Sequence, residues 1–289
     1  MPLKKRFKTG QFAILAEMDP PKGVDVSAMV KHASRVKGEV DAFIVPEMNS
    51  AVMRMSALGG AMVLQSKGME TVMQVNCRDR NRIAIQADLL AAGALGIPGI
   101  MAVSGEEPRF GDHPEAKAVY DLDLMTLIQA AVGLNRGKDM AGIELAGSTE
   151  FMVGSTVDPG VDEGRMEEEI ATLTAKAEAG VDFFVAPALF DPAAVKAFTD
   201  RIDTTRFRIL PTVLLLKSVG MARYVDRNFK NIYVPPDMIS RIQKAGDRAQ
   251  ECVRIATETI RALKKAGFAG AVISTIGWED KLPEILSKI

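Results

Sequence analysis

The chain has 289 residues, of which 47% are hydrophobic and 25% are charged, and its formal net charge is -1 at pH 7. This composition is typical of a soluble globular protein, and the nearly neutral charge argues against nucleic acid as a partner. No apolar run approaches the roughly 20 residues of a membrane span, and residues 1–9 lack the apolar stretch of a signal peptide. With two cysteines and two histidines, neither a disulfide framework nor a metal site is expected. The scarcity of cysteine predicts a cytoplasmic location.

Short apolar segments alternate with helical patterns along the chain. Segments typical of strands buried on both faces are residues 12–16, 42–45, 71–75, 99–103, 142–145, 183–186, 208–214 and 271–276. Helical patterns occupy residues 26–36, 51–66, 81–94, 122–135, 165–179, 191–202, 218–228, 239–266 and 279–289. Glycine closes many helices, and the helix-ending glycines are Gly68, Gly137, Gly180 and Gly267. This alternation predicts an α/β fold, a (β/α)₈ TIM barrel that forms one domain over residues 1–289.

The main alternative fold is a doubly wound open sheet. Such a sheet places a glycine-rich turn directly after its first strand. Here the first strand is followed by Glu17-Met-Asp-Pro-Pro-Lys-Gly23, which does not have that pattern. A near match, Gly93-Ala-Leu-Gly96-Ile-Pro-Gly99, lies between a helix and the next strand, on the wrong side of the strand. The sequence therefore favours the barrel.

A long polar loop follows the fourth predicted strand. The apolar run of residues 97–103 stops at Ser104-Gly-Glu-Glu-Pro108, and a helical pattern returns only at Leu122. Loops of this length in compact domains are usually functional or disordered. A solvated surface loop is the alternative interpretation. In a barrel this loop would begin at the end of the strands that carries the active site.

The predicted strand ends place two carboxylates at one cavity, Glu17 and Glu106, with the amides Gln74 and Asn76 between them. Glu17 directly follows an apolar strand, so partial desolvation is expected to raise its pKa and suit it to general-acid catalysis. A salt-bridged glutamate at the barrel rim is the alternative. The remaining predicted strand ends carry Pro46, Glu47, Gly147, Ser148, Pro187, Lys217 and Thr275.

An arginine-rich run, Cys77-Arg-Asp-Arg-Asn-Arg82, starts the helix after the third strand. Arginine forks and free backbone N–H groups at a helix start can bind a phosphate or carboxylate. A solvated helix start with internal ion pairs explains the same run equally well. The neighbouring arginines could lower the pKa of Cys77, but the absence of a paired histidine argues against a nucleophile.

Several of these motifs together resemble the methylenetetrahydrofolate reductase family, and most closely its short form from anaerobic and acetogenic bacteria. The resemblance extends from Glu17 to Gly277. It rests on Glu17-Met-Asp-Pro-Pro-Lys-Gly23, Cys77-Arg-Asp-Arg-Asn-Arg82, Gly105-Glu-Glu-Pro108, Gly111-Asp-His-Pro-Glu-Ala-Lys117, Tyr120-Asp-Leu-Asp123, Lys176 before Ala179-Gly180, Phe190-Asp191, and Leu214-Leu-Leu-Lys-Ser-Val-Gly-Met-Ala-Arg-Tyr224.

The resemblance implies a barrel that transfers a hydride from reduced flavin to the one-carbon bridge of methylenetetrahydrofolate. It implies that Glu17 protonates the departing nitrogen and that Glu106, where the family usually has Asp, stabilises the cationic iminium. It also implies a set of residues that bind FAD or FMN: Gln74, Asn76, Val103, Ser104, Gly105, Tyr120, Asp121 and Lys176. The loop of residues 106–120 would cover the flavin. Folate is the implied substrate, and an electron-donating subunit containing iron-sulfur or zinc is the implied partner.

The chain departs from the family pattern at four strand ends. Pro187 stands where the family usually has a Gln that contacts flavin and pterin, and Pro46 stands where it has a flavin-binding Thr. Gln74 replaces a His, and Ser104 replaces an Arg that contacts flavin in longer bacterial enzymes. Two further functions therefore remain open: a pterin-binding methyltransferase without flavin, and a non-catalytic barrel subunit of a redox complex.

Overall fold

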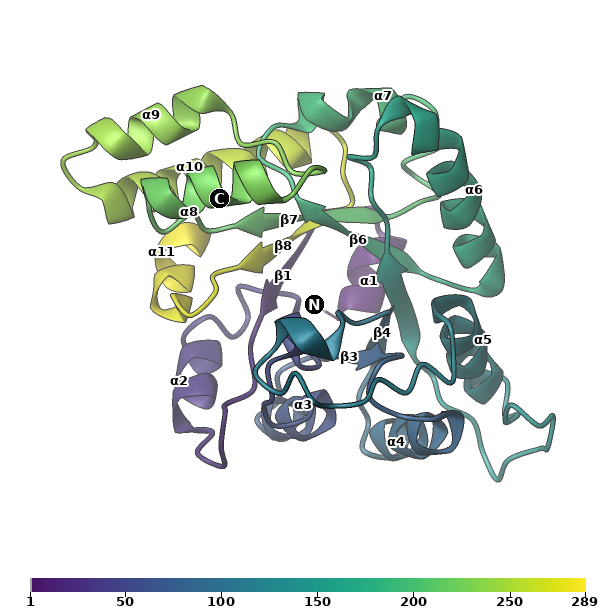
Figure 1. The fold of residues 1–289 in the computed structure, drawn as a ribbon. Helices are drawn as coiled ribbons and strands as arrows, with labels where there is room; N and C mark the ends of the chain where they lie inside the picture. The colour runs from purple at the N-terminus through teal and green to yellow at the C-terminus, as the bar shows by residue number, and fades with distance from the viewer. Residues whose placement is uncertain (1) are drawn as a thin grey trace.

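Eight parallel strands close into a barrel in which each strand pairs with the next and β8 returns to β1. The computed structural model describes residues 2–289 and is shown in Figure 1. The strands are β1 (Ala13–Glu17), β2 (Ala42–Val45), β3 (Thr71–Asn76), β4 (Gly99–Val103), β5 (Met152–Thr156), β6 (Phe183–Ala188), β7 (Ile209–Leu214) and β8 (Gly270–Ser274). The predicted (β/α)₈ barrel is thereby confirmed.

Helices surround the barrel on its outside (Figure 1). They are α2 (Ser27–Arg35), α3 (Ala57–Ser66), α4 (Arg82–Ala94), α5 (Leu124–Asn135), α6 (Glu163–Ala179), α7 (Lys196–Thr199), α8 (Val219–Asn228), α9 (Pro236–Lys244), α10 (Arg248–Lys265) and α11 (Leu282–Leu286). Short 3₁₀ turns are η1 (Asn49–Ala51), η2 (Pro108–Phe110), η3 (Pro192–Val195) and η4 (Glu279–Lys281). Within residues 2–289, no helix is both long and apolar enough to cross a membrane.

The amino-terminal end of the barrel is closed by α1 (Leu3–Lys8), a helix that the sequence patterns did not predict. Leu3 and Phe7 of this helix pack into the apolar interior of the barrel, and the Phe7 ring lies 5.8 Å from that of Phe183. Because strand side chains alternate between faces, Leu15 points into this interior, and Glu17, two residues later, also points inward. The interior is therefore sealed at one end and becomes polar at the other.

The fifth strand differs from the prediction. Residues 142–145 form an exposed turn, in which Gly142 has a φ of +83° and Asp139 accepts hydrogen bonds from the N–H groups of Ala141 and Ile143. The strand is instead β5, Met152–Thr156. The small and polar residues of β5 gave no apolar signal in the sequence. Gly154 has no room for a larger side chain, because the Phe183 ring fills the space beside it. Gly147 and Ser148 consequently precede the strand and do not mark its carboxyl end.

Polar capping residues change the bounds of two of the predicted helices. Residues 239–266 contain two helices, because Asp247 interrupts the pattern and caps α10 by accepting the Gln250 N–H at 3.0 Å. The pattern at residues 51–66 becomes a helix only at Ala57, where Ser56 caps α3. The predicted helix-ending glycines all have positive φ values: Gly68, Gly137, Gly180 and Gly267.

Candidate active site

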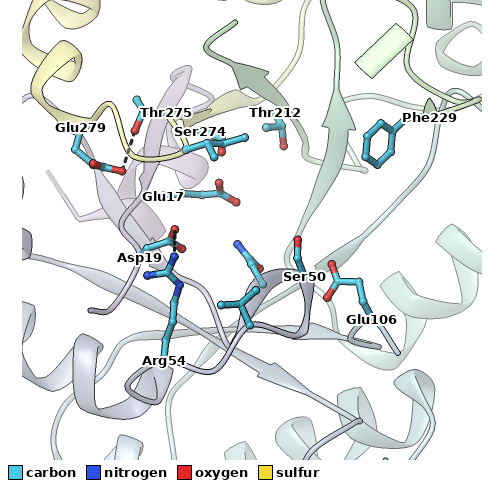
Figure 2. A pocket seen from close by; sticks show the side chains of 13 residues that line it. Glu17, Asp19, Ser50, Arg54, Glu106, Thr212, Phe229, Ser274, Thr275 and Glu279 are labelled. Carbon is cyan, nitrogen blue, oxygen red and sulfur yellow. Dashed lines mark hydrogen bonds and ion pairs between the residues drawn. The ribbon is translucent and has the colours of Figure 1, made fainter. Parts of the chain in front are cut away.

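A cavity of about 510 Å³ opens at the carboxyl end of the barrel. Its walls come from strand ends and from the loops that follow them (Figure 2). The lining residues are Glu17, Asp19, Asn49, Ser50, Val52, Arg54, Glu106, Thr212, Phe229, Ser274, Thr275, Ile276 and Glu279. Four of these side chains are carboxylic acids and one is a guanidinium, so the lining favours ligands that carry or develop positive charge.

Glu17 is the last residue of β1 and lies deep in the cavity. Burial raises its pKa from the ordinary value near 4.5 to about 7. A hydrogen bond from Ser274 opposes this shift, and the negative charge of Asp19 adds to it. Both protonation states of Glu17 are therefore populated near neutral pH, which is the condition for efficient proton transfer.

Asp19 lies beside Glu17 and forms an ion pair with Arg54 at 4.0 Å. Burial raises the pKa of Asp19, the charge of Arg54 lowers it, and the charge of Glu279 raises it again. Arg54 also donates a hydrogen bond to the Pro20 carbonyl at 3.2 Å. The guanidinium of the cavity lining is thereby paired with Asp19, the acidic neighbour of Glu17.

Glu106 stands on the opposite wall, in the loop between β4 and α5 (Figure 2). Its side chain is 57% exposed, and its carboxylate lies 4.0 Å from Nη1 of Arg78. The structure thus places the two predicted catalytic residues, Glu17 and Glu106, at one cavity. Their catalytic roles stay a prediction at this point.

Strained backbone is concentrated around the same cavity. Among residues 2–289, non-glycine residues with positive φ are Met48, Ser50, Ala51, Tyr120 and Ile276. All five lie in loops that follow β2, β4 or β8, and Ser50 and Ile276 line the cavity. Strain of this kind persists only where the surrounding structure enforces it, and it clusters at functional sites.

The sequence patterns missed several cavity residues, including Asp19, Ser50, Arg54 and Glu279. A signal for Asp19 was present, because it follows Glu17 by two residues and so continues the inward-facing series. Arg54 belongs to the stretch 51–66 that was predicted as helix but forms a loop before Ala57, and Ser50 directly precedes that stretch.

Gln74 and Asn76, predicted to lie between the two carboxylates, are buried and are not part of the cavity lining. The Gln74 side-chain oxygen accepts the Glu47 N–H at 3.2 Å. The Asn76 amide donates to the Asp79 carboxylate at 2.7 Å, and its oxygen accepts the Asp79 N–H at 3.1 Å. Both side chains therefore use their polar atoms to hold neighbouring loops.

Lys176 and Asp121 are also engaged within the protein. The Lys176 ammonium is buried and donates to the Thr156 carbonyl at 2.7 Å, and burial lowers its pKa. Asp121 accepts hydrogen bonds from the Arg82 backbone at 2.8 Å and from its side chain at 2.9 Å. Lys176 therefore supports the end of β5 and Asp121 supports the start of α4.

The other predicted cofactor residues lie at the end of β4. Val103 and Gly105 are partly buried, and Ser104 is exposed. Gly105 has a φ of +83°. Tyr120 is 39% exposed, and its hydroxyl donates to the Gly105 carbonyl at 3.2 Å. This group forms a partly open surface next to Glu106.

Gln74, Asn76 and Lys176 each make a hydrogen bond within the protein. The Gln74 amide and the Lys176 ammonium carry further N–H donors, and the flavin-binding role of these residues stays a prediction. The excess of carboxyl groups in the cavity lining is unfavourable for the phosphate of a flavin nucleotide. The segment 103–105 with Tyr120 is the part of the predicted set that forms an accessible surface next to Glu106.

The arginine-rich run forms internal ion pairs. Arg78 pairs with Asp79 at 2.6 Å, Arg80 with Asp88 at 2.5 Å, and Arg82 with Asp121. Burial, assisted by the charge of Asp123, raises the pKa of Cys77 to about 11, so the expected lowering by the neighbouring arginines is wrong. Within residues 2–289, no group of three or more His, Cys, Asp or Glu side chains could hold a metal ion.

A parallel barrel with carboxyl groups in a cavity at its strand ends defines a TIM barrel whose chemistry is expected at that rim. The chain belongs to the methylenetetrahydrofolate reductase family, because the model of the family described as methylenetetrahydrofolate reductase matches residues 2–289. It is also similar to methylenetetrahydrofolate reductase 2 of Schizosaccharomyces pombe, with 24% identity over 208 residues. This match covers 69% of the chain but 31% of the fission-yeast protein.

Proposed function

We propose that the chain binds 5,10-methylenetetrahydrofolate in this cavity and interconverts it with 5-methyltetrahydrofolate. The observation that supports this function most strongly is the environment of Glu17, whose pKa of about 7 allows it to donate a proton at neutral pH. Family membership supplies the substrate class.

In the reductive direction, the one-carbon bridge first opens. The bond from the bridge carbon to the departing nitrogen breaks, the electron pair stays on that nitrogen, and Glu17 supplies its proton. The carbon that remains is part of a cationic iminium, which then accepts a hydride to become the methyl group. Glu106 and the other carboxylates of the lining stabilise the positive charge before the hydride arrives.

The proposed source of the hydride is a flavin, FAD or FMN, because the family generally uses one. This part of the proposal rests on family membership. When bound, the flavin would supply this hydride, and the segment 103–105 with Tyr120 would contact it next to Glu106. The proposal includes an electron-donating partner subunit with iron-sulfur or zinc, which would return the cofactor to its reduced form.

The departures from the family pattern at Pro46 and Pro187 favour a second candidate function, a pterin-binding methyltransferase that works without flavin. Such a protein would keep the proton donor and the negatively charged cavity. It would not need Gln74, Asn76 and Lys176 to contact a cofactor.

Two measurements on the purified protein distinguish these functions. Bound flavin absorbs at about 450 nm, and calorimetry measures the affinity for methyltetrahydrofolate. A yellow protein that bleaches on addition of methyltetrahydrofolate supports the reductase. A colourless protein that binds methyltetrahydrofolate and remains colourless after incubation with FAD or FMN supports the flavin-free function. Failure to bind folate, with and without added flavin, would overturn both.

A matched pair of variants assigns any binding to this cavity. Glu106→Gln removes a carboxylate of the lining, whereas Glu258→Gln removes one from the outer face of α10. We expect only Glu106→Gln to change the affinity for methyltetrahydrofolate. Equal affinities in the two variants would place folate elsewhere.

A further inference from the structure

Arg78 is buried beneath the loops that form two walls of the cavity. Its side chain is 3% exposed, and it does not line the cavity itself. Nη1 donates to the Glu106 carbonyl at 3.0 Å, and Nη2 lies 3.5 Å from the Met48 carbonyl. One guanidinium therefore connects the loop after β4 with the strained loop after β2.

The backbone of Arg78 holds the other end of the same loop. Its carbonyl accepts the Val119 N–H at 2.7 Å. The loop of residues 104–123, here named the β4–α5 loop, is thus attached to Arg78 near its beginning, at Glu106, and near its end, at Val119. Gly105 packs directly over this residue, since a Cβ there would lie 3.1 Å from the Arg78 Cβ.

Asp79 fixes the orientation of the guanidinium. Arg78 Nε donates to one oxygen of Asp79 at 2.6 Å, and Nη2 donates to the other at 2.7 Å. Asn76 then holds Asp79 through both its side-chain atoms. The buried guanidinium is thereby paired with a carboxylate, which matters because an unpaired buried charge is strongly unfavourable.

The number and direction of these contacts require arginine. A planar guanidinium offers five N–H donors in a fixed fork, so it can bind a carboxylate with one edge and reach carbonyls with another. A lysine ammonium at this position would keep the charge. It could not reproduce the bidentate pair with Asp79 and the bond to Glu106 at the same time.

We propose that Arg78 is a positioning residue that sets Glu106 opposite Glu17 and holds the β4–α5 loop in place over the cavity. Arg78 acts through the backbone of Glu106 and does not touch the ligand. The part of this inference that concerns ligand binding rests on the proposed function, whereas the part that concerns the loop is independent of it.

Limited trypsin digestion tests the loop without any ligand. Arg109 and Lys117 of the β4–α5 loop are both exposed. In Arg78→Met we expect cleavage at these two sites to become faster by about tenfold or more, with a smaller increase in Arg78→Lys. Arg80→Lys, which disturbs a neighbouring ion pair outside the loop, should leave the rates unchanged. Unchanged rates at both sites in a folded Arg78→Met would overturn the inference.

General destabilisation has a different signature. Partial unfolding would accelerate cleavage at lysines and arginines across the chain, whereas the release of one loop accelerates it at Arg109 and Lys117 alone. If Arg78→Met does not fold, Arg78→Lys carries the test, because it retains the charge opposite Asp79. Accelerated cleavage spread across the chain in Arg78→Lys would assign Arg78 a merely structural role and overturn the inference.

A double-mutant cycle tests the link to Glu106. If Arg78 acts by positioning Glu106, then Glu106→Gln should have a clearly smaller effect on folate affinity in the Arg78→Lys background than in the wild-type background. Additive effects of the two substitutions would overturn the positioning role. If the wild type does not bind folate, the proposed function fails, and the cleavage rates alone then decide the role of Arg78 in holding the loop.

Discussion

Glu17 and Glu106 face each other across one cavity, but their surroundings differ. Glu17 ends β1 and is desolvated by the barrel, which brings its pKa to about 7. Glu106 lies in the β4–α5 loop with a side chain that is 57% exposed. Two carboxyl groups in unlike environments are suited to separate roles, one as a proton donor and one as a fixed negative charge.

We expect Glu17→Gln to lower folate turnover by about 10²–10⁴-fold, since an amide cannot donate the proton to the departing nitrogen. In the wild type, turnover that depends on protonated Glu17 should decline as pH rises above about 7. The measurement is steady-state turnover as a function of pH, with calorimetry to show that the variant still binds methyltetrahydrofolate. A variant that keeps half or more of wild-type turnover would contradict the role of Glu17.

The pH dependence of the free energy of unfolding should also reveal the titration of Glu17. Folded Glu17 holds its proton up to about pH 7, while the unfolded chain releases it near pH 4.5. The unfolded state thus binds fewer protons in this window, and the contribution of Glu17 to the free energy of unfolding falls as pH rises, by up to about 3 kcal/mol.

Glu17→Gln removes this titration. Relative to the wild type, the variant should therefore gain stability between about pH 5 and about pH 8. Urea unfolding of both proteins across this range measures the difference, in which the titrating groups that do not interact with Glu17 cancel. A constant difference across the range would show that Glu17 is not desolvated in the folded protein.

Much of the barrel could be predicted because its strands carry their own signal. The apolar segments at residues 42–45 and 99–103 coincide with β2 and β4. The strand β5 could not be found this way, because its Met-Val-Gly-Ser-Thr sequence carries a weak apolar signal and its Gly154 is required by the neighbouring Phe183 ring. Its position is a tertiary effect, which periodicity in the sequence does not record.

The site was predictable to the extent that strand ends meet at one rim. That rule placed Glu17 and Glu106 at the same cavity. It also predicted Gln74 and Asn76 there; both are buried, and their amides bond to the backbone and side chains of neighbouring loops. The position of a residue along its strand determines which end of the barrel it reaches. The hydrogen bonds within the neighbouring loops determine how its polar atoms are used.

Gly154→Ala tests the corrected fifth strand. An added Cβ would overlap the Phe183 ring, and overpacking of this kind usually lowers stability by about 1–3 kcal/mol. The control is Gly164→Ala near the start of α6, where the space beside the glycine is open apart from Asp162. Urea unfolding should show destabilisation of the first variant alone. Two equally stable variants would argue that Gly154 does not face Phe183.

Pro187→Gln tests the departure at the end of β6. Pro187 lies where the pairing of β6 with β7 shifts register, between Ala186 and Ala188, and it has no side-chain donor. Glutamine should tighten folate binding by about one hydrogen bond, 0.5–1.5 kcal/mol. Pro187→Leu is the matched control, since it adds bulk without a donor. Calorimetry that finds weaker or unchanged binding for Pro187→Gln would indicate a cavity organised for a different ligand.

The last prediction concerns the proposal that the β4–α5 loop covers a flavin. Without ligand, Asp112 holds the middle of this loop by pairing with Lys22 and by accepting the Met53 N–H at 2.9 Å, while Arg109 and Lys117 remain exposed.

A flavin bound beneath the loop should favour its closed state, because a ligand stabilises the conformation that it binds. We therefore expect tryptic cleavage at Arg109 and Lys117 to slow on addition of FAD or FMN. Cleavage at exposed sites on the outer helices, such as Lys265 at the end of α10, should proceed at an unchanged rate. Equal cleavage of the loop in the absence of flavin, with FAD and with FMN would exclude the loop as a flavin cover and favour the flavin-free function.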